Sequence, residues 1–286
     1  MQRLFNTMLI PVDFSRNTEL AVKKGIELSG DTTVIHLLHV QSSEKYLFVS
    51  DQRENNGHGM AEGYRHIEKC LHQWKLSIEE SHPFIKVCTW NVMAGSVEHT
   101  VIKKAVQLKA DLIIIGKNSN HPWLRFLNTV NPGQIIRETG IPVLTVKQGS
   151  FHTKIRKIVV PVSSRSVQDK MQIVAALGKR FRIHVYIVTI MIDSSEPIGF
   201  YASTLLDLYK WIKTVVGCPV EYAVLKGRNK ARAILKYASG INADVLLLYP
   251  DAETKVGWMN TDICDILPST TNLEVLTVQP FHSATA

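Results

Sequence analysis

An internal repeat limits the possible folds of this chain more than any other feature. Residues 7–40, TMLIPVDFSRNTELAVKKGIELSGDTTVIHLLHV, match residues 157–190, KIVVPVSSRSVQDKMQIVAALGKRFRIHVYIVTI, without a gap, so that Pro11 falls on Pro161. Each segment is an apolar run, a polar turn, a stretch of helical period and a second apolar run, which predicts a β-α-β unit. The match resumes at ADLIIIG (110–116) with ADVLLLY (243–249), and at IPVLTV (141–146) with LEVLTV (273–278).

A repeat of this length is too long for a solenoid and indicates two copies of one domain. We expect the first copy at residues 1–147 and a more divergent second copy at 154–280, with a linker between them. Strands that alternate with helices predict parallel sheets with helices on both faces. In the first copy we expect strands near 8–13, 33–40, 84–92, 111–116 and 141–146, and helices near 16–29, 60–80, 96–109 and 131–139.

Composition excludes several classes of protein. The 286 residues are 45% hydrophobic, which is ample for two cores, and the longest apolar runs are strand-sized, so we expect no membrane segment. The N-terminal stretch reaches Asp13 too soon for a secretory signal. Four widely spaced cysteines without C-x-x-C are typical of reduced thiols in a cytoplasmic protein. The net charge of +8 lies in small groups without an aromatic-interleaved basic stripe, so no nucleic-acid partner is expected.

A ligand of such a sheet would lie beyond the carboxyl ends of the strands, at the switch point in strand order. In the first copy this edge receives residues 11–15, His39-Val40 and the loop that follows 111–116. Asp13 could accept a hydrogen bond from a ribose hydroxyl or a ring amine. It could equally cap the next helix, with Ser15 and Asn17 as alternative caps, because both uses draw on the same backbone donors.

The chain resembles a tandem universal stress protein. The resemblance rests on MLIPVDFS, VIHLLHV, ADLIIIG and IPVLTV, covers nearly all of the first copy, and extends to the second copy by pattern. It implies a stress-linked role and two flavodoxin-like α/β domains (adenine nucleotide alpha-hydrolase-like), each a five-stranded parallel sheet between helices. The family typically dimerises through its last strand. The flat apolar VLTV strands therefore predict that the two copies pair through them as a pseudo-dimer, and a homodimer is left open.

Many members of this family bind ATP through a G-x2-G-x9-G-(S/T) pattern after the fourth strand. Gly116 matches the first glycine, whereas Ser119 stands at the second. Thr129 and Val130 stand at the third glycine and the residue after it, and one residue of slip aligns Asn128-Thr129 with Gly-Ser. A lost glycine matters because a Cβ would crowd the phosphates, and asparagine is the best substitute at positive φ.

The resemblance therefore implies one site for ATP or AMP, in the first copy only, and no other cofactor. Its residues would be Pro11, Val12, Asp13, Val40, Gly116, Asn118, Ser119, Asn128, Thr129 and Val130. In the second copy Ser163 replaces Asp13, Tyr249-Pro250 replaces Gly116-Lys117, and an acidic loop follows. We expect no nucleotide there, because acidic side chains repel phosphate.

Other groups of polar residues give weaker indications of a metal site or a catalytic site. The segment 41–82 contains three histidines and two glutamates: His58, His66, His72, Glu62 and Glu68. It has no H-E-x-x-H motif, so we expect no metal site. Residues 55–59, NNGHG, have loop composition. No nucleophile elbow or Walker lysine is present, so no catalytic residue is assigned. The sequence thus favours a non-catalytic binding or signalling scaffold slightly over an ATP- or AMP-binding module, and both over a weak ATPase.

Overall fold

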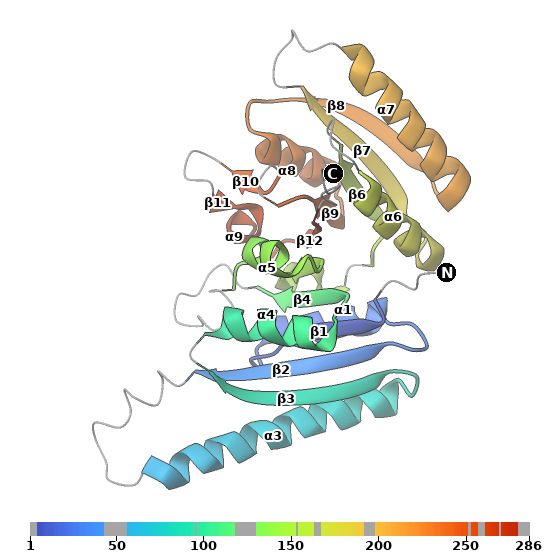
Figure 1. Ribbon diagram of the computed structural model, residues 1–286. Coiled ribbons are helices and arrows are strands. Elements are labelled where there is room, and N and C mark those ends of the chain that lie inside the picture. The colour runs from blue at the N-terminus through green and yellow to red at the C-terminus, as the bar shows by residue number, and fades with distance from the viewer. Residues whose placement is uncertain are drawn as a thin grey trace, which may run out of the picture. The chain divides into compact units, whose positions relative to one another are not determined.

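The computed structural model of the chain divides into two compact units, each described here by itself (Figure 1). Phe5–Ile141 form the N-terminal unit, and Pro142–Ala286 form the C-terminal unit. The structure describes residues 5–42, 56–94, 96–117, 130–152, 154–162, 167–191, 198–250, 253–256, 261–268 and 270–279. Within these residues, no helix combines the length and the apolar character that a membrane span requires.

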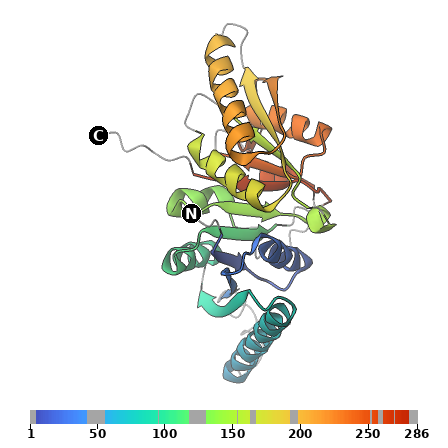
Figure 2. The same ribbon diagram turned by 90° about the vertical axis from the view of Figure 1, so that its right-hand side faces the viewer.

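The N-terminal unit is an α/β layer structure whose sheet has the strand order β3-β2-β1-β4, all parallel. Helices lie on both faces of the sheet (Figures 1 and 2). The elements are β1 (Thr7–Pro11), α1 (Arg16–Leu28), β2 (Val34–Ser42), α3 (Asn56–Ser81), β3 (Lys86–Ala94), α4 (Val97–Leu108), β4 (Leu112–Gly116) and α5 (Pro132–Thr139).

These elements confirm the strands and helices expected for this part of the first copy, with one correction. The sequence 55–59 has loop composition, yet α3 is already helical at Asn56. Glycine weakens a helix by only about 1 kcal/mol per residue, and tertiary context commonly overrides such a preference. Helix α5 begins and ends as its sequence predicts. Asn131 accepts from the N–H groups of Gly133 and Gln134, and Gly140 ends the helix in the left-handed conformation.

The C-terminal unit has the strand order β5-β12-β9-β6-β7-β8. All its pairings in that sheet are parallel except the antiparallel pairing of β5 with β12, in which Leu144 lies opposite Leu276. The elements are β5 (Val143–Val146), η2 (Gln148–His152), β6 (Lys157–Pro161), α6 (Gln168–Arg180), β7 (His184–Met191), α7 (Ile198–Trp211), the π-helical η3 (Ile212–Val216), β8 (Val220–Lys226), α8 (Lys230–Gly240), β9 (Val245–Leu248), β10 (Lys255–Val256), β11 (Thr261–Asp262), α9 (Ile263–Ile266) and β12 (Glu274–Thr277).

The division between the units falls before β5 rather than after it. The closing strand of the first copy therefore belongs to the C-terminal unit, where it pairs with the closing strand of the second copy. This pairing of the two VLTV strands agrees with the sequence expectation. The wider packing of the copies about a pseudo-twofold axis, and the copy boundaries 1–147 and 154–280, stay predictions.

A repeated carboxylate contact shows the duplication at the level of single atoms. The Asp111 side chain accepts hydrogen bonds from the backbone N–H groups of Asn6 and Thr7, at the start of β1. The Asp244 side chain accepts from Arg156 and Lys157 in the same way, at the start of β6. The two aspartates occupy the same place in ADLIIIG and ADVLLLY, so each copy ties its first strand to the strand beside it with the same residue.

Candidate functional site

The candidate site lies at the carboxyl edge of the N-terminal sheet, where β1 has β2 on one side and β4 on the other. The chain runs from β1 outward to β2 and β3 and then crosses to β4 on the other side of β1, so this edge is the switch point at which open α/β sheets bind ligands. Pro11 ends β1, with Val12 and Asp13 directly after it, and Gly116 ends β4. The structure thus places these four predicted residues at or just after the ends of the two neighbouring strands that border the switch point.

Asp13 caps helix α1. Its Oδ1 atom accepts from the backbone N–H of Ser15, at 3.0 Å, and shares the hydroxyl proton of Thr18, at 3.1 Å, with the Ser15 carbonyl, at 2.8 Å. Ser15 stands at the N-cap position in extended conformation, but its side chain makes no capping hydrogen bond. Of the two uses that the sequence left open for Asp13, the cap is therefore present. The carboxylate is half-buried and keeps part of its surface accessible to a ligand.

Aromatic rings line this edge beside Asp13. Phe14 adopts φ of 59°, and its ring lies 5.3 Å, centroid to centroid, from both His39 and Trp74. The His39 Nδ1 atom donates to the Val12 carbonyl at 2.7 Å, which fixes the backbone immediately before Asp13. Sequence reasoning singled out only the backbone of His39-Val40 and missed Phe14 and Trp74. Trp74 comes from α3, so no spacing within the β1 motif could have indicated it.

Gly116 is required by packing. A Cβ added at this residue would lie 2.2 Å from the backbone carbonyl oxygen of Asn17, in the first turn of α1. A glycine here therefore serves the contact between β4 and α1, whether or not a phosphate binds. Among the residues that the structure describes, the buried side-chain oxygen of Asn17 has no hydrogen-bond partner, which is uncommon for a buried polar atom.

The remaining predicted residues fall into two groups. Val40 and Val130 are fully buried, so only their backbone groups could meet a ligand. Lys117, which the sequence did not single out, is also buried, and its ammonium group donates to the Val130 carbonyl at 3.5 Å. The loop residues Asn118, Ser119, Asn128 and Thr129 lie outside the described residues.

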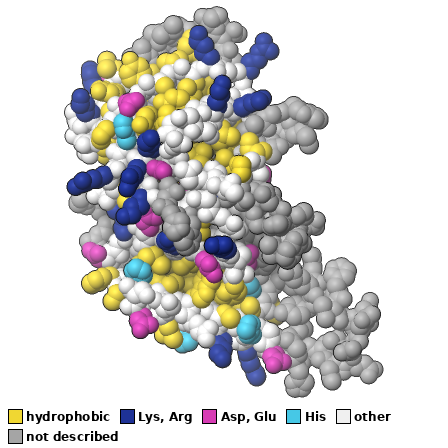
Figure 3. All heavy atoms as spheres, turned by 180° about the vertical axis from the view of Figure 1, so that it is seen from behind, with side chains coloured by type: hydrophobic (Ala, Val, Ile, Leu, Met, Phe, Trp, Pro, Cys, Tyr) yellow, Lys and Arg dark blue, Asp and Glu magenta, His cyan; other side chains and the backbone are white. Residues whose placement is uncertain are grey.

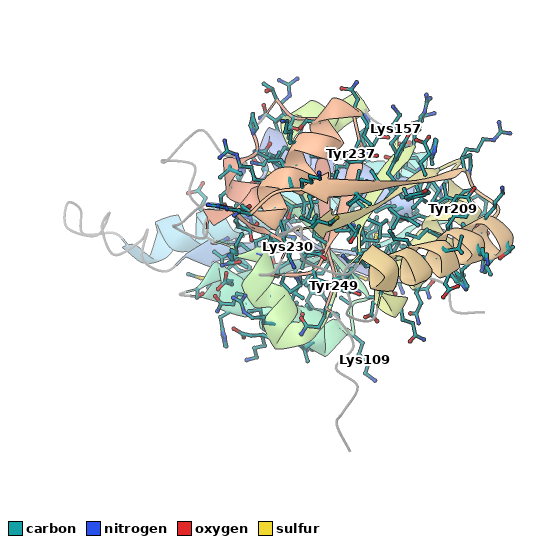
Figure 4. The ribbon with its side chains drawn as sticks, turned by 90° about the horizontal axis from the view of Figure 1, so that it is seen from above. Lys109, Lys157, Tyr209, Lys230, Tyr237 and Tyr249 are labelled. Atoms are coloured by element: carbon teal, nitrogen blue, oxygen red, sulfur yellow. The ribbon has the colours of Figure 1, made fainter. Side chains whose placement is uncertain are left out.

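The corresponding edge of the C-terminal unit contains charged groups of the chain itself. The Lys170 ammonium is completely buried and donates to the Pro161 carbonyl, at 2.8 Å, and to Glu253 Oε2, at 2.6 Å. Tyr249, labelled in Figure 4, donates its backbone N–H to the same Glu253 oxygen at 2.7 Å. The Lys170 ammonium also lies 4.0 Å from the centroid of the Tyr249 ring.

Burial controls the ionisation of this group. It raises the pKa of the Tyr249 hydroxyl, and the nearby Asp169 and Glu253 carboxylates raise it further, so the phenol stays neutral. Burial also lowers the pKa of Lys170, whereas the Glu253 carboxylate opposes that shift by direct pairing. Ser163, which the sequence aligns with Asp13, lies outside the described residues.

One histidine of α3, His66, lies beside a cysteine of the same helix. Cys70 Sγ lies 3.7 Å from His66 Nε2, one helical turn away. In the part of the chain that the structure describes, no group of three or more His, Cys, Asp or Glu side chains is placed to hold a metal ion. On the face shown in Figure 3, Lys and Arg side chains stand in small groups among hydrophobic, acidic and histidine side chains.

Comparisons with known proteins agree with this architecture. A universal stress protein from Archaeoglobus fulgidus superposes with a TM-score of 0.67 at 17% identity, over 97% of each chain. A putative universal stress protein from Pseudomonas aeruginosa gives 0.60 at 16%, over 96% of this chain and 94% of that one. The cytoplasmic domain of a prokaryotic cation chloride cotransporter gives 0.51 at 10%, over 96% of both. At these identities the likeness concerns the fold alone.

A search of the curated proteins found no match. The model of the universal stress protein family matches residues 4–147, which is half of the chain and contains Asp13, Val40 and Gly116. The solved structures span both halves with the same flavodoxin-like α/β architecture. The chain belongs to the universal stress protein family.

Proposed function

We propose that this protein is a non-catalytic binding or signalling scaffold of the stress response, acting in the cytoplasm. The observation that carries the proposal is that both sheet edges use their polar groups for the fold. Asp13 caps α1 in the N-terminal unit, and Lys170 and Glu253 pair with each other in the C-terminal unit. Four free cysteines, without a disulfide among them, suit a reducing compartment.

The closing strands support assembly within a single chain. Strand β12 pairs with β9 on one side and with β5 on the other, so neither of its edges is free for a second molecule. We therefore extend the proposal: the two copies within one chain associate through β5 and β12, and these strands do not form a homodimer with a second molecule. Sedimentation equilibrium checks this extension: a dimer that Thr277→Pro dissociates would contradict it.

A second candidate function is binding of ATP or AMP at the first copy, and one specific observation favours it. Within the described part of the chain, the Asn17 side-chain oxygen is buried without a partner, and the Asn17 backbone lies against Gly116. A ribose hydroxyl or an adenine amine would supply the missing donor, and the half-buried Asp13 carboxylate could share it. Leaving a buried acceptor unsatisfied costs about 1–3 kcal/mol, which a bound ligand would recover.

Release of bound nucleotide separates the two candidates. The purified protein is denatured, the supernatant is searched for ATP and AMP by mass spectrometry, and the native protein is titrated with ATP by calorimetry. The scaffold proposal expects no nucleotide and no heat up to millimolar ATP. Binding that Asn17→Ala and Asp13→Ala abolish would establish the second candidate instead.

The control for that experiment is Ser96→Ala. Ser96 accepts from the His99 N–H at the start of α4, so its loss weakens a helix start without touching the candidate site. Gly116 variants are unsuitable, because the packing against Asn17 would be lost with them. A weak ATPase, the third alternative, would release phosphate above background at a rate that Asn17→Ala lowers and Ser96→Ala leaves unchanged.

A further inference from the structure

The carboxyl edge of the C-terminal unit contains a buried arrangement of donors around one carboxylate oxygen. Glu253 Oε2 accepts from the Lys170 ammonium at 2.6 Å and from the Tyr249 backbone N–H at 2.7 Å. Lys170 is 0% and Glu253 6% exposed at the side chain. An ammonium and a backbone N–H that converge on one anionic oxygen are the donors with which proteins also bind phosphate.

The internal repeat shows which position of the first copy corresponds to the Tyr249 N–H. ADVLLLY aligns with ADLIIIG, so the Tyr249 N–H occupies the position of the Gly116 N–H, where the strand ends and the next loop starts. Lys170 reaches the same place from α6, and it donates a second hydrogen bond to the Pro161 carbonyl at the end of β6. The Glu253 carboxylate therefore lies where an external anion would meet the edge of the second sheet.

We propose that the second copy holds an oxyanion-binding site, formed by the Lys170 ammonium and the Tyr249 N–H, that Glu253 occupies as an internal ligand. Its external ligand would be a small oxyanion such as inorganic phosphate. Because the carboxylate belongs to the chain, its effective concentration at the site is high, and free phosphate does not displace it from the native protein. This site does not depend on nucleotide binding in the first copy.

One neighbouring group opposes an external anion. Asp169 precedes Lys170 on α6, is buried, and lies close enough to Tyr249 for its carboxylate to raise the pKa of the phenol. Its charge would repel phosphate once Glu253 is removed, and it offers Lys170 an alternative partner. The test therefore includes Asp169→Asn, which removes this charge with little change in shape.

The experiment creates the vacancy in the full-length chain with Glu253→Ala. Thermal unfolding is followed as sodium phosphate replaces sodium chloride at constant ionic strength. The unfolding midpoint of Glu253→Ala is expected to rise with phosphate more than that of the unchanged protein, and more again with Asp169→Asn added. The rise is expected to disappear in the double variant Lys170→Met/Glu253→Ala. Any response of the first copy is common to all these proteins and cancels in the comparison.

Two controls complete the test. Glu68→Ala removes an exposed carboxylate of α3 and equals Glu253→Ala in net charge, so it should show no added response. Glu253→Gln keeps the side-chain volume in place and should respond less than Glu253→Ala. A folded Glu253→Ala that gains nothing from phosphate, even with Asp169→Asn, would overturn the proposal, as would a gain that persists without Lys170.

Glu253→Ala can also leave Lys170 unpaired and fail to fold in chloride. The proposal then expects phosphate at the same ionic strength to restore folded protein, measured by circular dichroism and gel filtration, for Glu253→Ala but not for Lys170→Met/Glu253→Ala. Equal recovery of both variants, or of neither, would overturn it. Calorimetric titration of the protein with ATP is a separate measurement. The phosphate experiment can therefore be interpreted even if the first copy does not bind nucleotide.

Discussion

At the scale of single residues, Gly116 lies against the Asn17 backbone of α1, and Asp13 accepts from the Ser15 N–H at the start of the same helix. The sequence predicts Asp13 and Gly116 at strand ends, and the structure has them there. The end of an apolar run indicates where a buried strand ends. The contacts of Asp13 and Gly116 with α1 follow from how closely that helix approaches the sheet, which no motif records. Phe14 and Trp74 meet only through tertiary packing, and so were missed.

The packing role of Gly116 can be measured directly. Gly116→Ala places a Cβ against the Asn17 backbone, which cannot move as a flexible side chain could. We expect a loss of about 1–3 kcal/mol in the free energy of unfolding, measured by urea denaturation. Gly240→Ala is the matched control, because nothing lies within 4 Å of its added Cβ, and it should change stability by less than about 1 kcal/mol.

His36 gives the N-terminal unit a dependence on pH. Burial and the nearby Lys104 and Lys86 charges lower the pKa of His36, whose Nδ1 accepts from the Trp90 indole N–H at 3.1 Å. The unfolded chain binds the proton first, so this contribution is complete above the ordinary value of 6.5 and is lost as the pH falls through the folded pKa.

Urea denaturation at pH 7.5, 6.5 and 5.5 tests this expectation. The free energy of unfolding should fall as the pH decreases, and less steeply in His36→Gln, because glutamine has no proton to bind in this range. His72→Gln alters an exposed residue of α3 and should retain the slope of the unchanged protein. Equal slopes for the three proteins would contradict the assignment to His36.

At the scale of elements, prediction succeeded where local chemistry decides. The buried parallel strands β1 and β4 are continuous apolar runs, as strands covered on both faces must be. Helix α5 is bracketed by Asn131-Pro132 and Gly140, each of which has one conformational use. The early start of α3, the π-helical turn η3 and the small β10-β11 pair are not among the elements that the sequence predicts.

The N-cap residues of α1 and α5 make different contacts, and the two helices can therefore be compared by matched substitutions. Asn131→Ala removes the acceptor for the Gly133 and Gln134 N–H groups, and we expect it to cost about 0.5–2 kcal/mol. Ser15→Ala changes the N-cap of α1, whose side chain makes no capping bond, and should stay within about 0.5 kcal/mol. If urea denaturation gave equal losses, the assignment of the α1 cap to Asp13 would be wrong.

At the scale of the whole molecule, the repeat predicted two copies of one fold, and the paired aspartates Asp111 and Asp244 show how far the resemblance between them extends. What the repeat could not predict is the buried pair Lys170 and Glu253. Lys170 falls on Leu20 of the first copy, so the alignment shows a charge in place of an apolar residue but not its partner. Glu253 lies in a segment where the copies no longer align.

The pairing of the two closing strands can be tested by a double-mutant cycle. Leu144 of β5 and Leu276 of β12 lie opposite each other, and both are buried. Each substitution by alanine should cost about 2–5 kcal/mol, and together they should depart from additivity by about 0.5 kcal/mol or more. Leu144→Ala combined with Leu37→Ala, from β2 of the other unit, should be additive within about 0.5 kcal/mol. Additivity of the first pair would argue against the register.

The Lys170–Glu253 pair also has an evolutionary consequence. Losing either partner alone leaves a buried charge uncompensated, which costs about 3–5 kcal/mol out of the 5–15 kcal/mol that typically holds a domain together. An ancestral line that had acquired both residues could therefore not return by single substitutions without passing through a poorly folded intermediate. The two positions are expected to change together among descendants of this chain or not at all.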